Sequence, residues 1–230
     1  MAERELWTVP MGLVGYAEAL ELQRNIARDR ISGAIKQDVL LLLEHRPVVT
    51  LGRSSKEQHL VASREYLAEN GVELFEAERG GDVTFHGPGQ LVGYPIMDLK
   101  RHRQDLHWYL RQLEQVMIDM LSDYGIPAER RPGLTGVWTR GKKIASIGVH
   151  ARDWVTWHGF ALNATTNLSF FDLIVPCGIS GVVMTSISRE LGLERLAMTD
   201  VRDRVTASFA RAFDLTAVMM PRSALFESVA

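Results

Sequence analysis

The sequence of 230 residues contains a single cysteine, Cys177. No internal disulfide is therefore possible, and a lone thiol is typical of a reducing compartment such as the cytoplasm. Long apolar runs are also missing: stretches such as residues 39–43 are far shorter than the roughly 20 residues that a membrane-spanning helix needs. The start, MAERELW, shows no apolar segment of the secretory type. These absences predict a cytoplasmic protein that does not contact a membrane.

An excess of either charge is missing as well, because 26 Lys and Arg face 28 Asp and Glu, a net charge of −2. Nucleic-acid binders that work by bulk charge carry a basic excess, so this balance argues against them. The chain is long enough for one large domain. We expect a single domain over residues 1–230. A change in composition near residues 180–195 predicts a larger subdomain over about 1–180 and a smaller one over about 181–230.

Apolar spacing predicts both helices and strands, in no regular alternation. Helices are expected over residues 16–30, 63–70, 105–124, 185–191 and 199–213. Strands are expected over residues 38–44, 48–51, 72–76, 83–85, 90–97, 136–139, 143–150 and 155–162. The last three, with a turn at residues 140–141, form a predicted meander. The mixture favours an α+β fold over a doubly wound sheet, and the run DVLLLLE predicts a central strand buried on both sides.

Two common cofactor motifs fail on inspection. GVWTRGKK, residues 136–143, approaches a phosphate-binding P-loop but ends in Lys rather than Ser or Thr, and it lies in a predicted hairpin. The scattered His86, His150, His158 and Cys177 match no metal-ligand spacing. We therefore expect no metal and no cofactor.

Three segments remain as candidates for chemistry. Residues 79–90, RGGDVTFHGPGQ, hold four glycines, which let a backbone approach a ligand closely; a plain pair of turns is the alternative. Lys143 begins the segment KIASIGVH, and strand alternation places it on an apolar face with Ala145 and Ile147. A lysine removed from water can act as a base, although a lysine with its ammonium group at the surface would also fit.

Cys177 lies in IVPCG, a predicted bend. A lone cysteine is often only a small buried apolar residue. As a nucleophile it would need a neighbouring cation or base, because a free thiol with a pKa of about 8.5 is mostly protonated at pH 7. Lys143 is the first candidate for that neighbour and His86 the second.

Together these segments resemble one family, the lipoyl(octanoyl) transferases, over roughly residues 38–191. The resemblance is carried by residues 79–90, by the strand 143–148, by HGFALN at 158–163 and by PCGI at 176–179. It implies a fold similar to the catalytic domains of biotin and lipoate protein ligases, with a mixed sheet, outer helices and a small second subdomain. It also implies transfer of an octanoyl group from octanoyl-acyl carrier protein to apo lipoyl domains.

In this family pattern Cys177 would carry the octanoyl group as a thioester, and Lys143 would move the protons. The acceptors would be the E2 subunits of 2-oxoacid dehydrogenases and the glycine cleavage H protein, and the enzyme would be a monomer. The substrate-binding residues implied by the resemblance are Arg79, Gly80, Gly81, Asp82, Val83, Thr84, Phe85, His86, Ser146, Ile147, Gly148, Gly159, Phe160 and Ala161.

Three alternatives stay open: an ATP-dependent lipoate or biotin protein ligase, an amidotransferase that moves octanoyl between lipoyl domains, and an acyl-binding module without catalysis. Replacing Cys177 with Ala would abolish either transferase and spare a ligase or a binding module. The acidic carrier protein would need a basic surface, for which we expect Arg130, Arg131, Arg140 and Lys142. The preferred length of the acyl chain does not follow from residue spacing.

Overall fold

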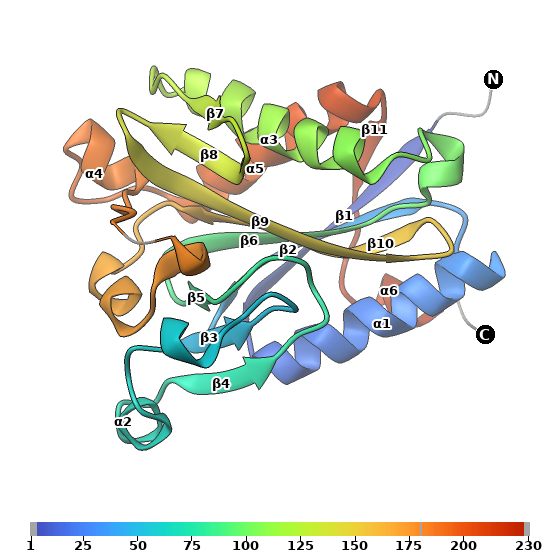
Figure 1. Ribbon diagram of the computed structural model, residues 1–230. Helices are drawn as coiled ribbons and strands as arrows, with labels where there is room; N and C mark the ends of the chain where they lie inside the picture. Colours follow the sequence, from blue (N-terminus) through green and yellow to red (C-terminus); the bar gives the residue numbers. More distant parts are fainter. Residues whose placement is uncertain (1–3, 180, 228–230) are drawn as a thin grey trace.

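The computed structural model describes residues 4–179 and 181–227, and its centre is a twisted eight-stranded sheet (Figure 1). The strands are β1 (Glu5–Val14), β2 (Asp38–His45), β6 (Gln90–Ile96), β7 (Glu129–Arg131), β8 (Leu134–Thr139), β9 (Lys142–Arg152), β10 (Val155–Asn163) and β11 (Thr216–Met219). Their order across the sheet is β11-β1-β2-β6-β10-β9-β8-β7. β1 runs parallel to both of its neighbours, and the other pairs are antiparallel. The predicted α+β class with a mixed sheet is confirmed.

Strand β2 is the central, doubly buried strand that its apolar run predicts. Leu40 and Leu42 point into the core beneath one layer of helices. Leu41 and Leu43 point into the core on the opposite face. Each of these side chains is at most 2% exposed, so each contributes about 2 kcal/mol of hydrophobic stabilisation.

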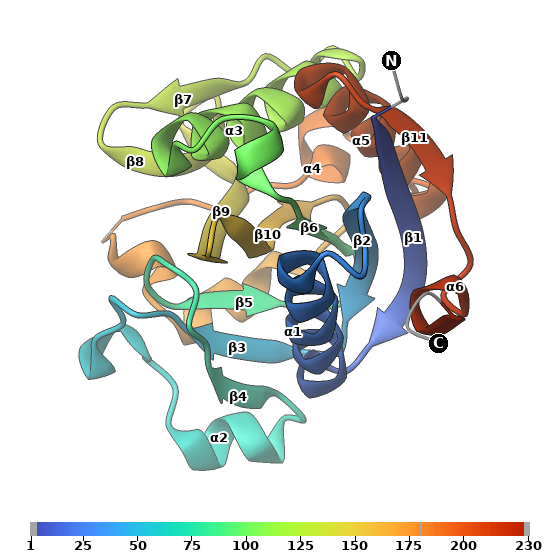
Figure 2. The ribbon, with the colours of Figure 1, turned by 90° about the vertical axis from the view of Figure 1, so that its right-hand side faces the viewer.

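Helices cover both faces of this sheet (Figures 1 and 2). α3 (Leu106–Ser122) and α5 (Met198–Phe213) lie on one face, and α1 (Tyr16–Ser32) lies on the other. The predicted helix at residues 105–124 is confirmed, and Asp105 caps it by accepting a bond from the backbone N–H of Trp108. The short helices α2 (Arg64–Glu69), α4 (Ile187–Leu191) and α6 (Ala224–Glu227) complete the set. No helix in the described part of the chain is both long and apolar enough to span a membrane.

A second, three-stranded sheet packs on the α1 side of the large sheet (Figure 1). It consists of β4 (Glu73–Glu76), β3 (Val48–Leu51) and β5 (Thr84–His86), in the order β4-β3-β5. The segments 48–51, 72–76 and 83–85 are therefore strands, as predicted. Short 3-10 helices, among them η1 (Glu57–His59), η3 (Leu168–Leu173) and η4 (Pro176–Gly178), border this sheet.

The strands β1 and β11 pair at one edge of the large sheet. β11 pairs with β1 in parallel, and α5 packs against α3 in the same core. The residues beyond 180 thus share a sheet and a core with the N-terminal strand. The division into subdomains at about residue 180 stays a prediction.

Candidate active site

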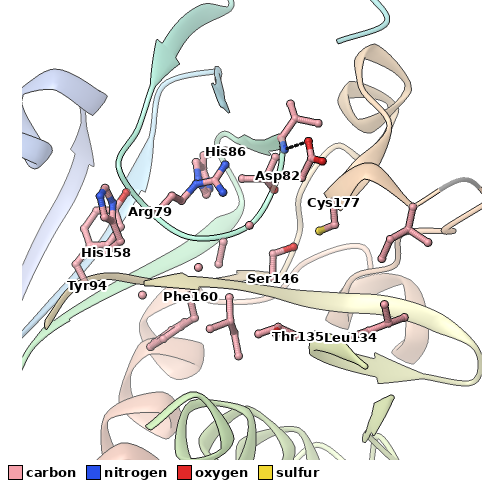
Figure 3. Close-up of a pocket in the computed structure, with 18 of the residues that line it drawn as sticks. Arg79, Asp82, His86, Tyr94, Leu134, Thr135, Ser146, His158, Phe160 and Cys177 are labelled. Carbon is pink, nitrogen blue, oxygen red and sulfur yellow. Dashed lines mark hydrogen bonds between the residues drawn. The ribbon is translucent and has the colours of Figure 1, made fainter. Parts of the chain in front are cut away.

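A cavity of about 260 Å³ lies between the two sheets. Its walls come from the glycine-rich loop with β5, from the middle of β9 and β10, and from the turn that carries Cys177 (Figure 3). The predicted site residues that line it are Arg79, Gly81, Asp82, Val83, Thr84, His86, Ser146, Ile147, Gly148, Gly159, Phe160, Ala161 and Cys177. The structure thus brings together residues from all of the segments singled out in the sequence.

Cys177 sits at one end of this cavity, in the tight turn η4. Its backbone is left-handed, with φ 57° and ψ 19°, a conformation that residues other than glycine rarely adopt. The turn is held by a hydrogen bond from the Cys177 N–H to the carbonyl of Val83, 3.1 Å away. The thiol is free, and the turn directs it at a single basic group.

That group is the Lys143 ammonium, whose Nζ lies 2.8 Å from the Cys177 Sγ. Lys143 is only 1% exposed, and its other hydrogen bond goes to the carbonyl of Thr135 at 3.3 Å. No carboxylate lies within ion-pair distance of Nζ among the described residues. Because a buried cation without an anionic partner is costly, the sulfur is its natural counter-ion when ionised.

A bulge in β9 explains how Lys143 reaches the thiol. Val137 of β8 pairs with Ala145, but Trp138 pairs with Lys143, so Ile144 is an extra residue. Ile144 and Ala145 consequently both enter the helix-side core, and the strict alternation expected for this strand is interrupted. The Lys143 side chain is released from that face and extends to the thiol.

Glycine at position 136 makes room for this side chain. Gly136 has φ 132°, and a Cβ there would lie 2.7 Å from the Lys143 Cε and 3.2 Å from its Nζ. It would also lie 2.7 Å from the Ala145 carbonyl oxygen, and contacts of 2.7 Å are shorter than a Cβ tolerates. Gly136, which in the sequence is only the first residue of the incomplete P-loop pattern, therefore forms part of the channel through which the Lys143 side chain extends.

The glycine-rich loop is anchored by the buried Arg79. Its Nη2 donates to the carbonyl and hydroxyl oxygens of Thr50 at 2.7 and 2.8 Å, and its Nη1 donates to the Gly80 carbonyl at 3.1 Å. Burial lowers the pKa of Arg79, although arginine stays protonated in proteins. The loop also packs tightly on β9, where a Cβ at Gly148 would lie 2.8 Å from the Gly80 carbonyl. The guanidinium therefore holds the loop against the cavity and adds positive charge to its wall.

His86 is a neutral acceptor in the cavity wall. Complete burial lowers its pKa well below the usual value. Gln90 donates through its amide to the Phe85 carbonyl and to Asn163, so its remaining oxygen accepts from the His86 Nδ1–H at 2.8 Å. The other ring nitrogen of His86 is then unprotonated. This arrangement makes His86 a poorer candidate than Lys143 for the cation beside Cys177.

Seven further residues line the cavity that the sequence patterns do not single out as site residues: Tyr16, Tyr94, Gly133, Leu134, Thr135, His158 and Ile179. Figure 3 shows Tyr94 and His158 far from Cys177. The Tyr16 hydroxyl and the His158 Nε2 are buried and lack a hydrogen-bond partner within the described residues. Ordered water or a polar ligand atom usually satisfies such groups. Two of these cavity residues lie in segments that carry the resemblance, His158 in HGFALN and Ile179 in PCGI.

Two predicted binding residues lie outside the cavity wall. Phe85 is 1% exposed and stacks on Phe170, with ring centroids 4.7 Å apart, in the core of the small sheet. Gly80 donates its N–H to Val149 at 2.8 Å and supports the loop from behind. Across residues 4–179 and 181–227, no three potential metal ligands lie together.

The chain matches a known protein family over most of its length. Residues 15–210 match the lipoyl protein ligase A/B catalytic domain. The octanoyltransferase of Solibacter usitatus is 51% identical over 94% of this chain and 95% of its own length. That of Synechococcus elongatus is 46% identical over 94% of this chain and 90% of its own. The chain belongs to the octanoyltransferase family. As a member of it the enzyme is an acyltransferase of protein lipoylation.

More distant solved structures share the fold of this chain. A bipartite lipoate protein ligase from Thermoplasma acidophilum has a TM-score of 0.77 at 16% identity, covering 98% of this chain and 90% of that one. A biotin protein ligase from Aquifex aeolicus has a TM-score of 0.51 at 11% identity, covering 92% and 69%. The predicted likeness to the biotin and lipoate ligase fold is confirmed.

Proposed function

We propose that the enzyme takes an octanoyl group from octanoyl-acyl carrier protein onto Cys177 and passes it to the lysine of an apo lipoyl domain. The observation that carries this proposal is the 2.8 Å contact between the Lys143 Nζ and the Cys177 Sγ at one end of the cavity. Acyl transfer needs a nucleophile, a base and a site for the acyl chain. Cys177, Lys143 and the cavity are our candidates for these three parts.

In the first half-reaction, Lys143 stabilises the Cys177 thiolate or accepts its proton. The sulfur attacks the carbonyl carbon of the carrier-bound thioester, so a new S–C bond forms as the carrier's S–C bond breaks. The leaving thiolate of the carrier takes up the proton. One thioester replaces another, and the exchange needs no ATP and no metal.

In the second half-reaction, an amine of the acceptor attacks the Cys177 thioester. A free lysine amine with a pKa of about 10.4 is almost wholly protonated at pH 7, so a base must remove its proton. The first ammonium proton leaves to solvent. Lys143, the basic group within reach of the sulfur, takes the second proton as the C–N bond forms and returns it to the departing Cys177 thiolate. An amide forms, the S–C bond breaks, and the free enzyme is restored.

The cavity suits a short acyl chain. Its volume of about 260 Å³ lies just below the roughly 300 Å³ at which small-molecule pockets usually begin. Phe160 and Ile147 supply apolar wall. For the carbonyl oxygen, the backbone N–H groups of Gly81 and Asp82 are the candidates, because neither makes a hydrogen bond within the described chain. Donors of this kind stabilise the charge that develops on that oxygen.

The donor and acceptors in this scheme are octanoyl-acyl carrier protein and the lipoyl domains of 2-oxoacid dehydrogenase E2 subunits and of the glycine cleavage H protein. A free, functional thiol suits a reducing compartment, for which we take the cytoplasm, and a monomer is sufficient for the site. Arg140 and Lys142 both pair with Glu190, and Arg130 pairs with the buried Glu114. Arg131 lies over the Trp138 ring. This basic surface remains our prediction for carrier docking.

Intact-protein mass spectrometry tests the proposal. Mixing the enzyme with octanoyl-acyl carrier protein, without ATP, should add one octanoyl group that hydroxylamine removes and that Cys177→Ala does not acquire. Labelling of an apo lipoyl domain only with free octanoate and ATP would establish a ligase instead. Loading from an octanoylated lipoyl domain but not from the carrier would establish an amidotransferase. Binding of the octanoyl donor without transfer in any of these mixtures would establish an acyl-binding module.

A further inference from the structure

A histidine–aspartate pair lies directly behind the turn that carries Cys177. The His59 Nδ1 is 2.8 Å from the Asp82 Oδ2, and the two side chains are only 13% and 10% exposed. Asp82 belongs to the cavity wall. His59 does not, and it has no part in the reaction scheme above.

Hydrogen bonds connect this pair to both sides of the turn. On one side, the Asp82 Oδ1 accepts from the Val83 N–H at 2.7 Å, and the Val83 carbonyl accepts from the Cys177 N–H at 3.1 Å. On the other side, the His59 carbonyl accepts from the Val175 N–H at 2.8 Å. The bond between Asp82 and His59 therefore links the two backbone segments that hold the Cys177 turn on either side.

The pair also packs against the backbone of the turn itself. A Cβ at Gly178 would lie 2.4 Å from the Asp82 Oδ2, 2.7 Å from the His59 Cε1 and 2.9 Å from its Nδ1. Gly178 has φ 66° as well. The residue after the nucleophile thus has to be glycine, because the bonded pair occupies the space that any side chain would need.

The left-handed backbone of Cys177 needs support from its surroundings. A φ of 57° is strained for cysteine, and strained residues persist only where their surroundings hold them in place. If the turn relaxes, Sγ moves away from the Lys143 Nζ, which is itself confined by Gly136 and Thr135. The short sulfur–ammonium contact therefore depends on what lies behind the turn.

We propose that His59 is a positioning residue for the nucleophile: its bond to Asp82 keeps the Cys177 turn in the geometry that sets Sγ beside Lys143. This inference rests on the proposed thioester mechanism. His59 acts through the turn and touches neither the acyl group nor the sulfur's proton. Its loss slows acylation of Cys177 without weakening binding of the donor.

The test compares three variants. His59→Ala removes the bond, whereas His59→Asn keeps a donor, since the asparagine Nδ2 can occupy the place of the His59 Nδ1. His102→Ala is the matched control, because His102 forms a similar pair with Asp38 at 2.6 Å, with side chains 3% and 4% exposed, away from the cavity. Single-turnover acylation by octanoyl-acyl carrier protein, the KM for that donor and the thermal midpoint are measured for each. Alkylation by iodoacetamide adds a chemical readout, since Cys177 is the sole cysteine.

We expect His59→Ala to slow acylation and alkylation at least tenfold with KM within twofold of the native value. His59→Asn should recover most of both rates. His102→Ala should lower the thermal midpoint while leaving both rates near native. Native-like acylation by His59→Ala, equal loss in His59→Asn, or equal loss in His102→Ala would each overturn the positioning role. Failure of the native enzyme to form any adduct would instead overturn the proposed function.

Discussion

Replacing Lys143 with methionine should separate the two half-reactions. Methionine fills a similar volume beside Trp138 but carries neither charge nor proton, so the 2.8 Å contact with Cys177 loses its electrostatic content. The first half-reaction needs the lysine to ionise a thiol, and the second needs it to deprotonate an amine. These two tasks differ in difficulty at neutral pH.

The size of each loss follows from ordinary ionisation. At pH 7 an unassisted thiol with a pKa of about 8.5 is about 3% ionised, so acylation should fall by up to about 30-fold. An unassisted amine with a pKa of about 10.4 is only about 0.04% neutral, so transfer to the acceptor should fall by up to about 2,500-fold. At pH 9 the same fractions rise to about 75% and about 4%, so acylation should recover almost fully and transfer only partly.

Two single-turnover measurements check this difference. One follows octanoyl addition to the enzyme by mass spectrometry, and the other follows loss of the group from preloaded enzyme after an apo lipoyl domain is added. Lys100→Met is the control, because the Lys100 side chain is 46% exposed, pairs with Asp98 at 3.9 Å and belongs neither to the cavity wall nor to the proposed docking surface. Its two rates should stay close to native at both pH values.

The reasoning would be refuted if Lys143→Met lowered both steps equally and neither recovered at pH 9. That result would mean that the lysine only shapes the cavity. A native rate in both steps would mean that a different group moves the protons.

Three further predictions concern the surroundings of this pair. Gly136→Ala should slow acylation at least tenfold, because the new methyl group would lie 2.7 Å from the Lys143 Cε; an unaltered single-turnover rate would contradict the channel. Phe160→Ala should cost about 3–5 kcal/mol in the free energy of unfolding and should favour decanoyl over octanoyl donors, since the ring lines the cavity; an unchanged ratio of the two rates would show that other residues limit chain length. Burial lowers the pKa of His45 from 6.5 to about 4, so below pH 6.5 the unfolded chain binds a proton that the native protein does not. Stability should therefore fall by about 2 kcal/mol between pH 7.5 and pH 5, and urea unfolding of His45→Gln should show a correspondingly weaker pH dependence; an equal dependence would assign the effect to other groups.

Local patterns were sufficient for most individual elements. The apolar run of β2, the helix at residues 105–124 and the turn before Lys143 each depend on neighbours within a few residues, and the structure confirms all three. β1 and β11 were not predicted. They pair with each other although they lie at opposite ends of the sequence. β1 also contains Pro10 and a bulge before Gly12, which blur its alternation.

The site was predictable where a motif carries it and not where packing does. The glycines, a lysine and a lone cysteine predicted which segments form the candidate site. The bulge at Ile144, which redirects the Lys143 side chain, has no recognisable pattern in a single sequence. Tyr16 reaches the cavity from the first turn of α1, which has no motif. Phe85 shows a second limit of motif reading, since a residue inside the predicted binding motif packs in the core of the small sheet.

The contact between Lys143 and Cys177 joins two layers of the molecule. Lys143 belongs to the large sheet through β9, whereas the Cys177 turn is tied to the segment that leads into the small sheet. The small sheet has only three short strands and several exposed loops, features of regions that open at lower free energy than the core. Acylation of the enzyme should then depend on whether the small sheet is folded, and not only on whether the whole chain is folded. In a denaturant titration the ability to form the acyl-enzyme should disappear before the far-ultraviolet signal of α3 and α5 begins to change.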